Sequence, residues 1–365
     1  MLQKIHLWIG IIIGAIFSLS GLTGSILVFD DELDAYFNSE LWHVSPQPGP
    51  IRLDEATGKV QAEFPNHTLL LARLPRESNR SIEYWIESDE VIELVYVDPW
   101  NLNILGKREE HAGFLGFLHD FHVHLLADDD GLFVNGLIGL VLLLTVLTGL
   151  WLAWPGWRKL INALRIPRKE SRVTRWFALH RSIGLISMIF LFIAALTGTA
   201  MVFYKQTNAV LIAVFGGPGL PEPPLIEAVA PQAATKSPSE LLRTAQSTVP
   251  GAQATWLRFP SQPQVPFVVR LKHPENSHPN GTSYVALNTV TGEVLMDHDA
   301  KYSGTGQQIA DLKYPLHIGT AAGLPGRLLM FAAGLVPTIL FVTGLYTWWY
   351  RRQKPQTKFA KVRLT

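Results

Sequence analysis

Four long apolar stretches divide the chain, at residues 5–29, 132–154, 176–204 and 324–350. Each has the length of about 20 residues that an α-helix needs to cross a bilayer. The first is too long for a secretory signal, and the acidic run that follows it is no cleavage site, so we predict an uncleaved anchor. The pattern predicts an α-helical integral membrane protein with four transmembrane helices.

The two longest segments between these stretches, 31–131 and 205–323, are polar and repeat one order of elements. Each begins with a Pro-, Gly- or Ser-bearing stretch and continues with a short helical pattern, in the second case with Ser237 as a possible N-cap. Alternating apolar positions then predict strands. The predicted helices are 53–63 and 238–248, and the predicted strands are 82–86, 90–97, 267–271 and 282–287. We predict two small α+β units, the first ending in a His-rich helix.

Basic residues set the expected orientation. The short loop 155–175 contains one acidic residue, Glu170, against seven basic ones: Arg158, Lys159, Arg165, Arg168, Lys169, Arg172 and Arg175. The tail 351–365 begins with Arg351 and Arg352, followed by Lys354. Positive charge accumulates on the cytoplasmic side of membrane proteins. We therefore expect this loop and both termini in the cytoplasm, and the two α+β units in the periplasm.

The transmembrane stretches are repeated within the chain. His6 recurs as His180, and the same shift of 180 − 6 = 174 carries Thr23-Gly24 onto Thr197-Gly198. A second shift of 317 − 122 = 195 carries His122 onto His317, and Thr148-Gly149 onto Thr343-Gly344. Two repeats of the same orientation imply a pseudo-two-fold axis along the membrane normal. This axis sets His6 opposite His180 and His122 opposite His317.

Histidines that face each other from neighbouring helices are the ligands that a bis-histidine haem requires. The 23 − 6 = 17 residues from His6 to Thr23 cover about 25 Å of helix axis. One pair is then near the cytoplasmic edge and the other near the outer edge, which predicts two haems, one in each half of the membrane. The alternative is that each histidine only anchors a helix end at the interface.

Composition narrows the possible chemistry. The chain of 365 residues is 48% hydrophobic and contains no cysteine, which excludes iron–sulfur clusters and covalently attached c-type haem. A net charge of +1 argues against nucleic acid as a partner. Any redox cofactor must therefore be held without a covalent bond through sulfur.

Two arginines are expected beside the haem sites. Arg181 follows His180 and Arg327 follows Gly326, and guanidinium groups pair bidentately with carboxylates such as haem propionates. Arg181 could equally be a positive-inside anchor. Both interpretations stay open at this point.

The His-rich segment before the second span allows a competing interpretation. His119 and His122 are three residues apart and share a helical face. With His124, His111 or Asp120 they could hold zinc or copper, and His119 or His124 could also replace His122 as a haem ligand. The repeat favours His122, because it aligns with His317. For the histidines elsewhere in the outer segments we expect solvated surface positions: His43, His67, His273, His278 and His298.

At these residues the chain resembles the PepSY-associated transmembrane proteins. The resemblance rests on His-x-x-x-Gly spans that end in Leu-Thr-Gly, on Phe121-His-Val-His-Leu-Leu, and on the segment from Leu316-His-Ile-Gly-Thr to Arg327. The turns of the outer segments resemble PepSY units. One departure is Asp128-Asp-Asp-Gly-Leu, where the family often has Gly-x-x-Gly-Arg, so the first copy lacks the arginine that would match Arg327.

The resemblance implies a bacterial inner-membrane protein of iron acquisition, similar to the FoxB-type ferrisiderophore reductases. It implies two b-type haems, at His6, His180, His122 and His317, and a ferric siderophore as the small-molecule substrate on the periplasmic side. The electron donor, a quinol or a cytoplasmic reductase, stays unknown. Two other functions remain: a haemless regulator or anchor that binds a periplasmic protein, and a transporter of siderophore or metal. Against transport we count the absence of an interior acidic residue and of a broken helix.

Overall fold

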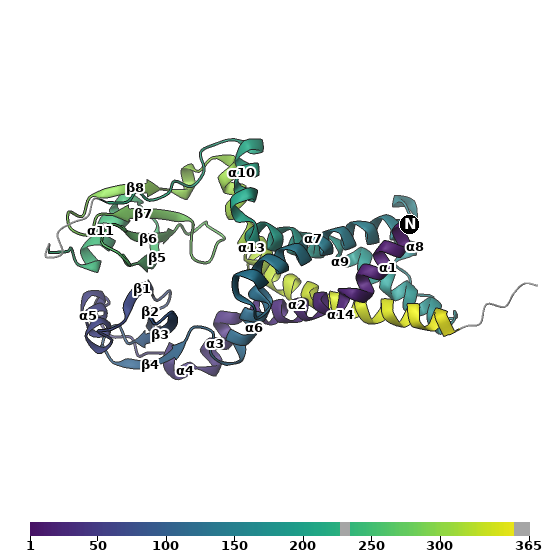
Figure 1. Cartoon of the computed structure of the whole chain (residues 1–365), viewed down its shortest axis with the longest axis horizontal. Coiled ribbons are helices and arrows are strands. Elements are labelled where there is room, and N and C mark those ends of the chain that lie inside the picture. Colours follow the sequence, from purple (N-terminus) through teal and green to yellow (C-terminus); the bar gives the residue numbers. More distant parts are fainter. Residues whose placement is uncertain (227–233, 354–365) are drawn as a thin grey trace, which may run out of the picture. The chain divides into compact units, whose positions relative to one another are not determined.

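The structure, a computed structural model, describes residues 1–226 and 234–353. Most of the predicted cytoplasmic tail, with Lys354, lies outside the described residues. The chain forms two compact units (Figure 1). The helical unit comprises Met1–Val28, Phe121–Thr199 and the described part of Leu328–Thr365, and the sheet unit comprises Phe29–Asp120 and Ala200–Arg327.

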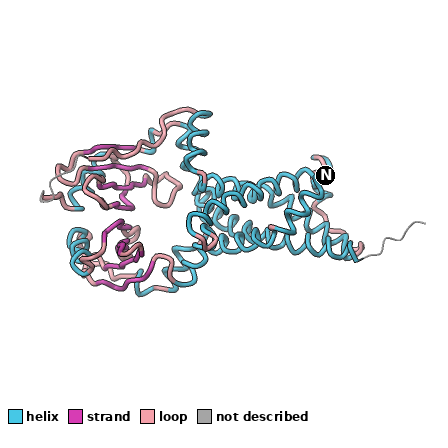
Figure 2. Tube along the Cα trace, viewed as in Figure 1, coloured by secondary structure: helices cyan, strands magenta, loops and turns pink. Residues whose placement is uncertain are grey.

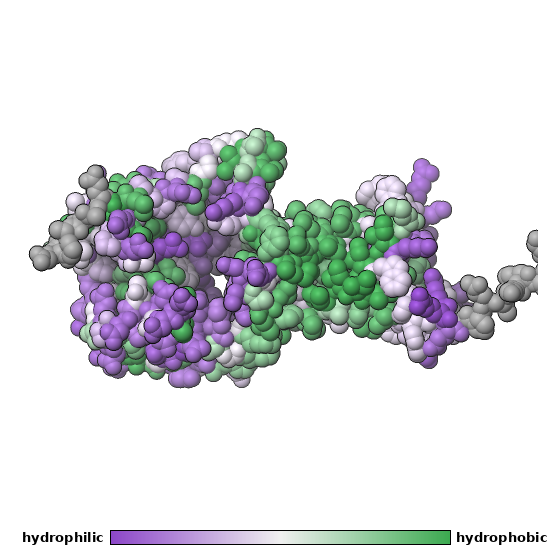
Figure 3. Space-filling model, in the orientation of Figure 1, coloured by the Kyte–Doolittle hydropathy of each residue, from purple (hydrophilic) through white to green (hydrophobic). Residues whose placement is uncertain are grey.

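The helical unit is built from the predicted spans. Its long helices are α1 (Leu2–Ile12), α2 (Gly14–Leu27), α7 (Asp128–Ala153), α9 (Arg172–Val202) and α14 (Gly323–Gln353). Three of them are long and apolar enough to cross a membrane, and the count becomes four if α1 and α2 form one bent span. Large apolar side chains such as Leu140, Leu144 and Leu147 are exposed on α7. The green surface over these helices in Figure 3 is therefore the surface expected to contact lipid.

The first span is broken, which the sequence did not predict. Helices α1 and α2 meet at an angle of 60° on either side of Ile13. Directly after the break, Gly14 packs so closely against the Phe341 ring of α14 that a Cβ there would overlap the ring. Sharp bends form where glycine permits such close packing. The absence of a broken helix, which we counted against transport, was thus a wrong prediction.

The sheet unit contains one antiparallel sheet of eight strands, which are magenta in Figure 2. Their order is β4-β3-β2-β1-β5-β6-β7-β8, with the labels given in Figure 1. The strands are β1 (Thr68–Arg73), β2 (Ile82–Ser88), β3 (Val91–Val97), β4 (Ile104–Glu109), β5 (Gln253–Arg258), β6 (Phe267–Lys272), β7 (Ser283–Leu287) and β8 (Val294–His298). The predicted helices are α5 (Leu53–Glu63) and α11 (Pro238–Thr248), and Ser237 caps α11 in a capping box with Glu240. The predicted strands correspond to β2, β3, β6 and β7, whereas the other four were not predicted.

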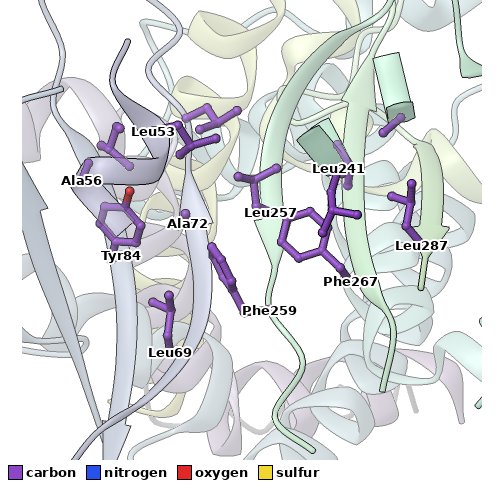
Figure 4. Close-up of a cluster of buried hydrophobic side chains, with 14 of the residues drawn as sticks. Leu53, Ala56, Leu69, Ala72, Tyr84, Leu241, Leu257, Phe259, Phe267 and Leu287 are labelled. Atoms are coloured by element: carbon purple, nitrogen blue, oxygen red, sulfur yellow. The ribbon is translucent and has the colours of Figure 1, made fainter. Parts of the chain in front are cut away.

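The duplication extends through this sheet. The shift from α5 to α11 is 238 − 53 = 185, and it also relates β1 to β5 (253 − 68) and β2 to β6 (267 − 82). Strands β1 and β5 pair directly, so that Ala72 faces its own equivalent, Leu257 (72 + 185). The side chains under α5 and α11 form one continuous core across this junction (Figure 4). The sequence predicted two separate α+β units, but the structure joins them into a single sheet.

The opposite face of the first half is covered by α3 (Asp30–Phe37) and α4 (Ser39–Trp42). Asp34 accepts a hydrogen bond from Trp42 Nε1 at 2.8 Å and pairs with Arg108. Arg73 binds Glu83 through two hydrogen bonds of 2.7 Å, and Asp31 at 3.0 Å. The remaining helices are α6 (Gly113–His124), α8 (Leu160–Ala163), α10 (Tyr204–Phe215), α12 (Thr305–Asp311) and α13 (Lys313–Ile318).

Asp30 makes the stability of the sheet unit depend on pH. Its burial, followed by the charges of Asp31 and Asp34, raises the pKa of the Asp30 carboxyl to about 6. A carboxyl whose folded pKa lies above its unfolded value stabilises the fold at low pH, and this contribution is lost as pH rises through about 6. As pH rises from about 4 to about 6, we therefore expect the free energy of unfolding of the wild type to fall by up to ~3 kcal/mol more than that of the Asp30→Asn variant.

Thermal unfolding of the purified protein across this pH range measures the effect. The Asp297→Asn variant, which changes an exposed aspartate on β8, serves as the control and should keep the wild-type profile. Identical pH profiles for Asp30→Asn and the wild type would contradict the prediction.

Candidate functional site: a histidine pair in the helical unit

The helical unit contains a cavity of about 880 Å³ between α1, α7, α9 and α14. Its volume falls in the range of about 300–1,000 Å³ that is typical of cofactor and small-molecule sites. Most of its walls are apolar, and the polar side chains that line it include His6, His180, Arg181 and Lys4. It is therefore an apolar site with a few polar groups, as expected for a bound cofactor.

The structure brings His6 and His180 together in this cavity. The centroids of the two imidazole rings are 6.4 Å apart, and the ring planes are at 84° to each other. Two imidazoles whose Nε2 atoms share one iron, at about 2.0 Å from the metal and with each nitrogen about 1.2 Å from its ring centroid, have centroids about 6.4 Å apart. The separation of the two rings thus matches bis-histidine ligation.

Hydrogen bonds orient both rings through Nδ1. His180 Nδ1 lies 3.0 Å from the Leu340 carbonyl oxygen and 3.0 Å from Thr343 Oγ1. His6 Nδ1 lies 3.1 Å from Thr148 Oγ1. Within residues 1–226 and 234–353, neither Nε2 atom has a hydrogen-bond partner. A ring that carries its proton on Nδ1 leaves Nε2 as the nitrogen that can bind a metal.

The Thr-Gly dipeptides of the repeat lie beside these rings, and we call each such dipeptide a Thr-Gly seat. Beside the orienting threonines, a Cβ on Gly149 would lie 3.0 Å from His6 Cε1, and a Cβ on Gly344 would lie 3.4 Å from His180 Cε1. The threonine thus orients the imidazole, and the glycine leaves room for it. Sequence reasoning missed this role, although the repetition of Thr-Gly in all four spans, after leucine in three and after Val342 in the fourth, was a signal for it.

Arg181 follows His180 and lines the same cavity, and it forms no ion pair with the carboxylates of the described residues. Its Nη2 donates a hydrogen bond to the Ala163 carbonyl oxygen at 2.8 Å, and its Nε is buried without a partner in the described chain. A buried cation of this kind is costly unless an anion pairs with it. Together with the two oriented histidines, Arg181 fits a haem whose propionate would supply that anion.

The second predicted pair is divided between the two units. His122, on α6, belongs to the helical unit, where its Nδ1 lies 3.0 Å from the Ser20 carbonyl oxygen and 3.2 Å from Thr23 Oγ1. A Cβ on Gly24 would lie 2.7 Å from His122 Cε1, so this ring has the same Thr-Gly seat. His317, on α13, belongs to the sheet unit. The pairing of His122 with His317 stays a prediction.

Arg327 has a protein partner that the sequence analysis did not foresee. Its guanidinium binds Glu32 through hydrogen bonds of 2.5 and 2.7 Å, and it lies 4.6 Å above the Phe29 ring. This pair holds the beginning of α14 to α3 within the sheet unit. A role for Arg327 beside a haem propionate stays a prediction.

The competing metal site has little support in the described chain. His119 stacks on His111, with ring centroids 5.8 Å apart. Residues 1–226 and 234–353 contain no group of three or more His, Cys, Asp or Glu side chains that could hold a metal ion. The use of His119 or His124 as an alternative haem ligand stays a prediction.

Of the five outer histidines that we expected to be solvated, only His43 is exposed, whereas His67, His278 and His298 are partly buried and His273 is buried. His273 is only 2% exposed, and its Nε2 lies 2.7 Å from Asp299 Oδ1. Burial, followed by the charges of Arg270, Lys272 and Arg76, lowers the pKa of His278 to about 3. The segment that follows β6 is polar in sequence, but His273 is buried there and His278 is partly buried.

Comparison with known families assigns the chain. A family model described as the PepSY-associated TM region matches residues 3–351. The chain belongs to this family. The match extends over all four predicted haem ligands and over the sheet unit. Membership in the PepSY-associated TM family agrees with the long apolar helices and supports a membrane protein. A search of curated proteins gave no match.

Proposed function

We propose that this protein is a di-haem b electron-transfer protein of the bacterial inner membrane, which reduces ferric siderophore iron in the periplasm as the FoxB-type reductases do. The observation that carries the proposal is the His6–His180 pair in its cavity, with a ring separation of 6.4 Å and both Nδ1 atoms hydrogen-bonded. His122 and His317 would hold the second haem.

The residues of the chain have separate tasks in this proposal. His6 and His180 ligate the metal, Thr148 and Thr343 orient them, and Arg181 neutralises a propionate. When bound, haem with two histidine ligands supplies a one-electron carrier without an open coordination position. The overall reaction takes one electron from a quinol or a cytoplasmic reductase and converts siderophore-bound iron(III) to iron(II). Iron(II) binds hard oxygen ligands less strongly, so that the siderophore can release it.

Positive charge at one end of the cavity supports the proposed orientation. Lys4, Arg181, Arg351 and Arg352 all line the cavity. These residues are close in sequence to the N-terminus, the basic loop and the end of α14, which the positive-inside rule assigns to the cytoplasm. The His6–His180 site would therefore receive the electron from the cytoplasmic side.

The bend between α1 and α2 is the one observation that favours a transporter, since broken helices often form transport sites. However, the acidic residues of the described spanning helices are confined to the first turn of α7. A coupled carrier commonly uses an acidic residue inside the membrane. The bend also contributes to the wall of a cavity that already fits haem, which favours electron transfer.

A difference spectrum of the purified protein, dithionite-reduced minus air-oxidised, with a haem count, tests the proposal. We expect low-spin b-type bands and about two haems per chain. Addition of a ferric siderophore should then reoxidise the reduced protein. Well-folded protein without haem, from cells with sufficient haem, would refute the proposal and leave the regulator or transporter.

The contact between the Thr343 hydroxyl and His180 Nδ1 leads to a further prediction. In the Thr343→Val variant, His180 Nδ1 keeps the Leu340 carbonyl but loses the Thr343 hydroxyl. Loss of a hydrogen bond that orients a metal ligand typically costs about 10- to 100-fold in affinity. We expect faster haem loss and a changed midpoint potential, measured by transfer to apomyoglobin and by redox titration. The Thr338→Val variant, on the same helix but outside the cavity wall, should behave as the wild type.

A further inference from the structure

A group of cations lies on the face of β6 and β7 that is turned away from α11. Val269 and Leu271 point into the core beneath α11, so the alternating residues Arg270 and Lys272 point to the other face. His278, in the segment after β6, contacts Arg270 there. Arg76, from the loop between β1 and β2, joins the group through a hydrogen bond to the Asn280 side chain. We name Arg76, Arg270, Lys272 and His278 the cationic cluster.

The positive charge of the cationic cluster is only partly compensated. Arg76 pairs with Asp31 at 3.3 Å, but neither Arg270 nor Lys272 has a carboxylate within 4.0 Å in the described part of the chain. Asp311 acts on Arg270 from beyond ion-pair distance, and its carboxylate accepts a hydrogen bond from Gln307 at 2.7 Å. Burial lowers the pKa of both Arg270 and Lys272. The fold therefore holds two cations near each other, half-buried, without an anion.

Hydrogen-bond donors are in surplus at the same place. His278 Nδ1 accepts the backbone N–H of Asn280 at 3.1 Å, so a neutral His278 carries its proton on Nε2. Arg270 Nη2, also a donor, lies 3.1 Å from that Nε2. Two donors that face each other both need an acceptor. A negatively charged oxygen could accept from both.

Two tyrosines contact the cationic cluster, and one of them is on the helix that carries a predicted haem ligand. Arg270 lies 5.4 Å above the Tyr284 ring, and the Tyr314 ring lies 5.1 Å from the His278 ring. Tyr314 is 40% exposed and precedes the predicted haem ligand His317 by three residues on α13. A ligand bound at the cationic cluster therefore lies beside the helix that carries that histidine.

We propose that the cationic cluster binds the negatively charged oxygens of a ferric chelate, and that the substrates of this protein are anionic complexes of the catecholate or hydroxycarboxylate class. This inference rests on the proposed function and names its substrate class. Guanidinium, ammonium and imidazole N–H groups supply charge-assisted hydrogen bonds to such oxygens. A neutral trihydroxamate complex offers less charge and should bind more weakly.

Gallium(III) complexes test binding apart from electron transfer, because gallium is not reduced under these conditions. We expect the full-length protein in nanodiscs to bind the triply negative gallium tris-catecholate complex, as measured by microscale thermophoresis. Both Arg270→Gln and Lys272→Gln should weaken binding by about tenfold or more. The Arg243→Gln variant removes an exposed cation from α11, which covers the opposite face, and should bind as the wild type does.

Several outcomes would overturn the inference. Unchanged affinity in Lys272→Gln would do so, even if Arg270→Gln failed to fold through loss of its hydrogen bond to the Gly281 carbonyl oxygen. Equal affinity for a neutral gallium trihydroxamate, or displacement of the complex by an equal concentration of inorganic phosphate, would also do so. Failure of the proposed function is distinguishable, because it would show as absent haem or absent reoxidation by a ferric siderophore while the gallium complex still binds.

Discussion

Replacing His180 with alanine should remove one of the two expected haems or convert it to a high-spin form. The His6 ring would then face a cavity without its partner imidazole at 6.4 Å, and a single axial ligand cannot maintain low-spin iron. Because electrons would have to cross the inner half of the membrane without a carrier, reduction of ferric siderophore with a cytoplasmic-side donor should fall by at least about 100-fold. The haem count and the reduced-minus-oxidised spectrum measure the first effect.

Control variants distinguish the loss of a haem ligand from a general loss of structure. The His43→Ala variant changes an exposed histidine of the sheet unit and should keep both haems. The His122→Ala variant should lose the other haem and retain the His6–His180 signal. Added imidazole should partly restore the low-spin spectrum of His180→Ala, because it fits the space that the side chain leaves. Two intact low-spin haems in His180→Ala would show that the pair is misassigned.

Replacing Leu257 with alanine should strongly destabilise the sheet unit. Leu257 is fully buried on β5, where it pairs with Ala72 of β1 and belongs to the core that both halves share. A Leu-to-Ala change in such a core costs about 2–5 kcal/mol, through lost burial and the cavity that remains. At this junction the loss affects both halves of the sheet.

Chemical denaturation followed by tryptophan fluorescence measures this effect. Trp85 and Trp256, with ring centroids 4.8 Å apart, lie on β2 and β5, on either side of β1, and report on the junction. The Leu225→Ala variant removes a side chain that is 76% exposed, and it should change the free energy of unfolding by less than about 0.5 kcal/mol. A loss below about 1 kcal/mol in Leu257→Ala would contradict a shared core.

The two halves of the sheet differ on the face that is turned away from their helices. In the first half, the face away from α5 is covered by α3 and α4 and carries the compensated pairs of Arg73 and Arg108. In the second half, the face away from α11 carries the cationic cluster, in which Arg76 pairs with Asp31 but Arg270 and Lys272 have no carboxylate partner among the described residues. The same fold thus provides a closed, paired surface in one copy and a charged surface for a ligand in the other.

Some features could be predicted from the sequence because they depend on neighbouring residues. Apolar length predicted the spanning helices, and capping residues with helical periodicity predicted α5 and α11 with the bounds that the structure shows. The internal repeat predicted the His6–His180 pair, because it relates residues that are 174 positions apart without any knowledge of packing. The structure then places these two rings side by side.

Other features were decided only by tertiary contacts. Strands β1 and β5 were missed because both of their faces are covered at the centre of the sheet, which removes the alternation that marks a half-buried strand. Gly14, directly after the bend at Ile13, packs against Phe341, more than 300 residues away, and Thr343 helps to orient His180. The sequence by itself determined which segments are long and apolar enough to cross a membrane, and which histidines are equivalent in the repeat. Only the tertiary structure decided how the two halves join and how each ring is held, because both depend on pairs of residues that no local pattern relates.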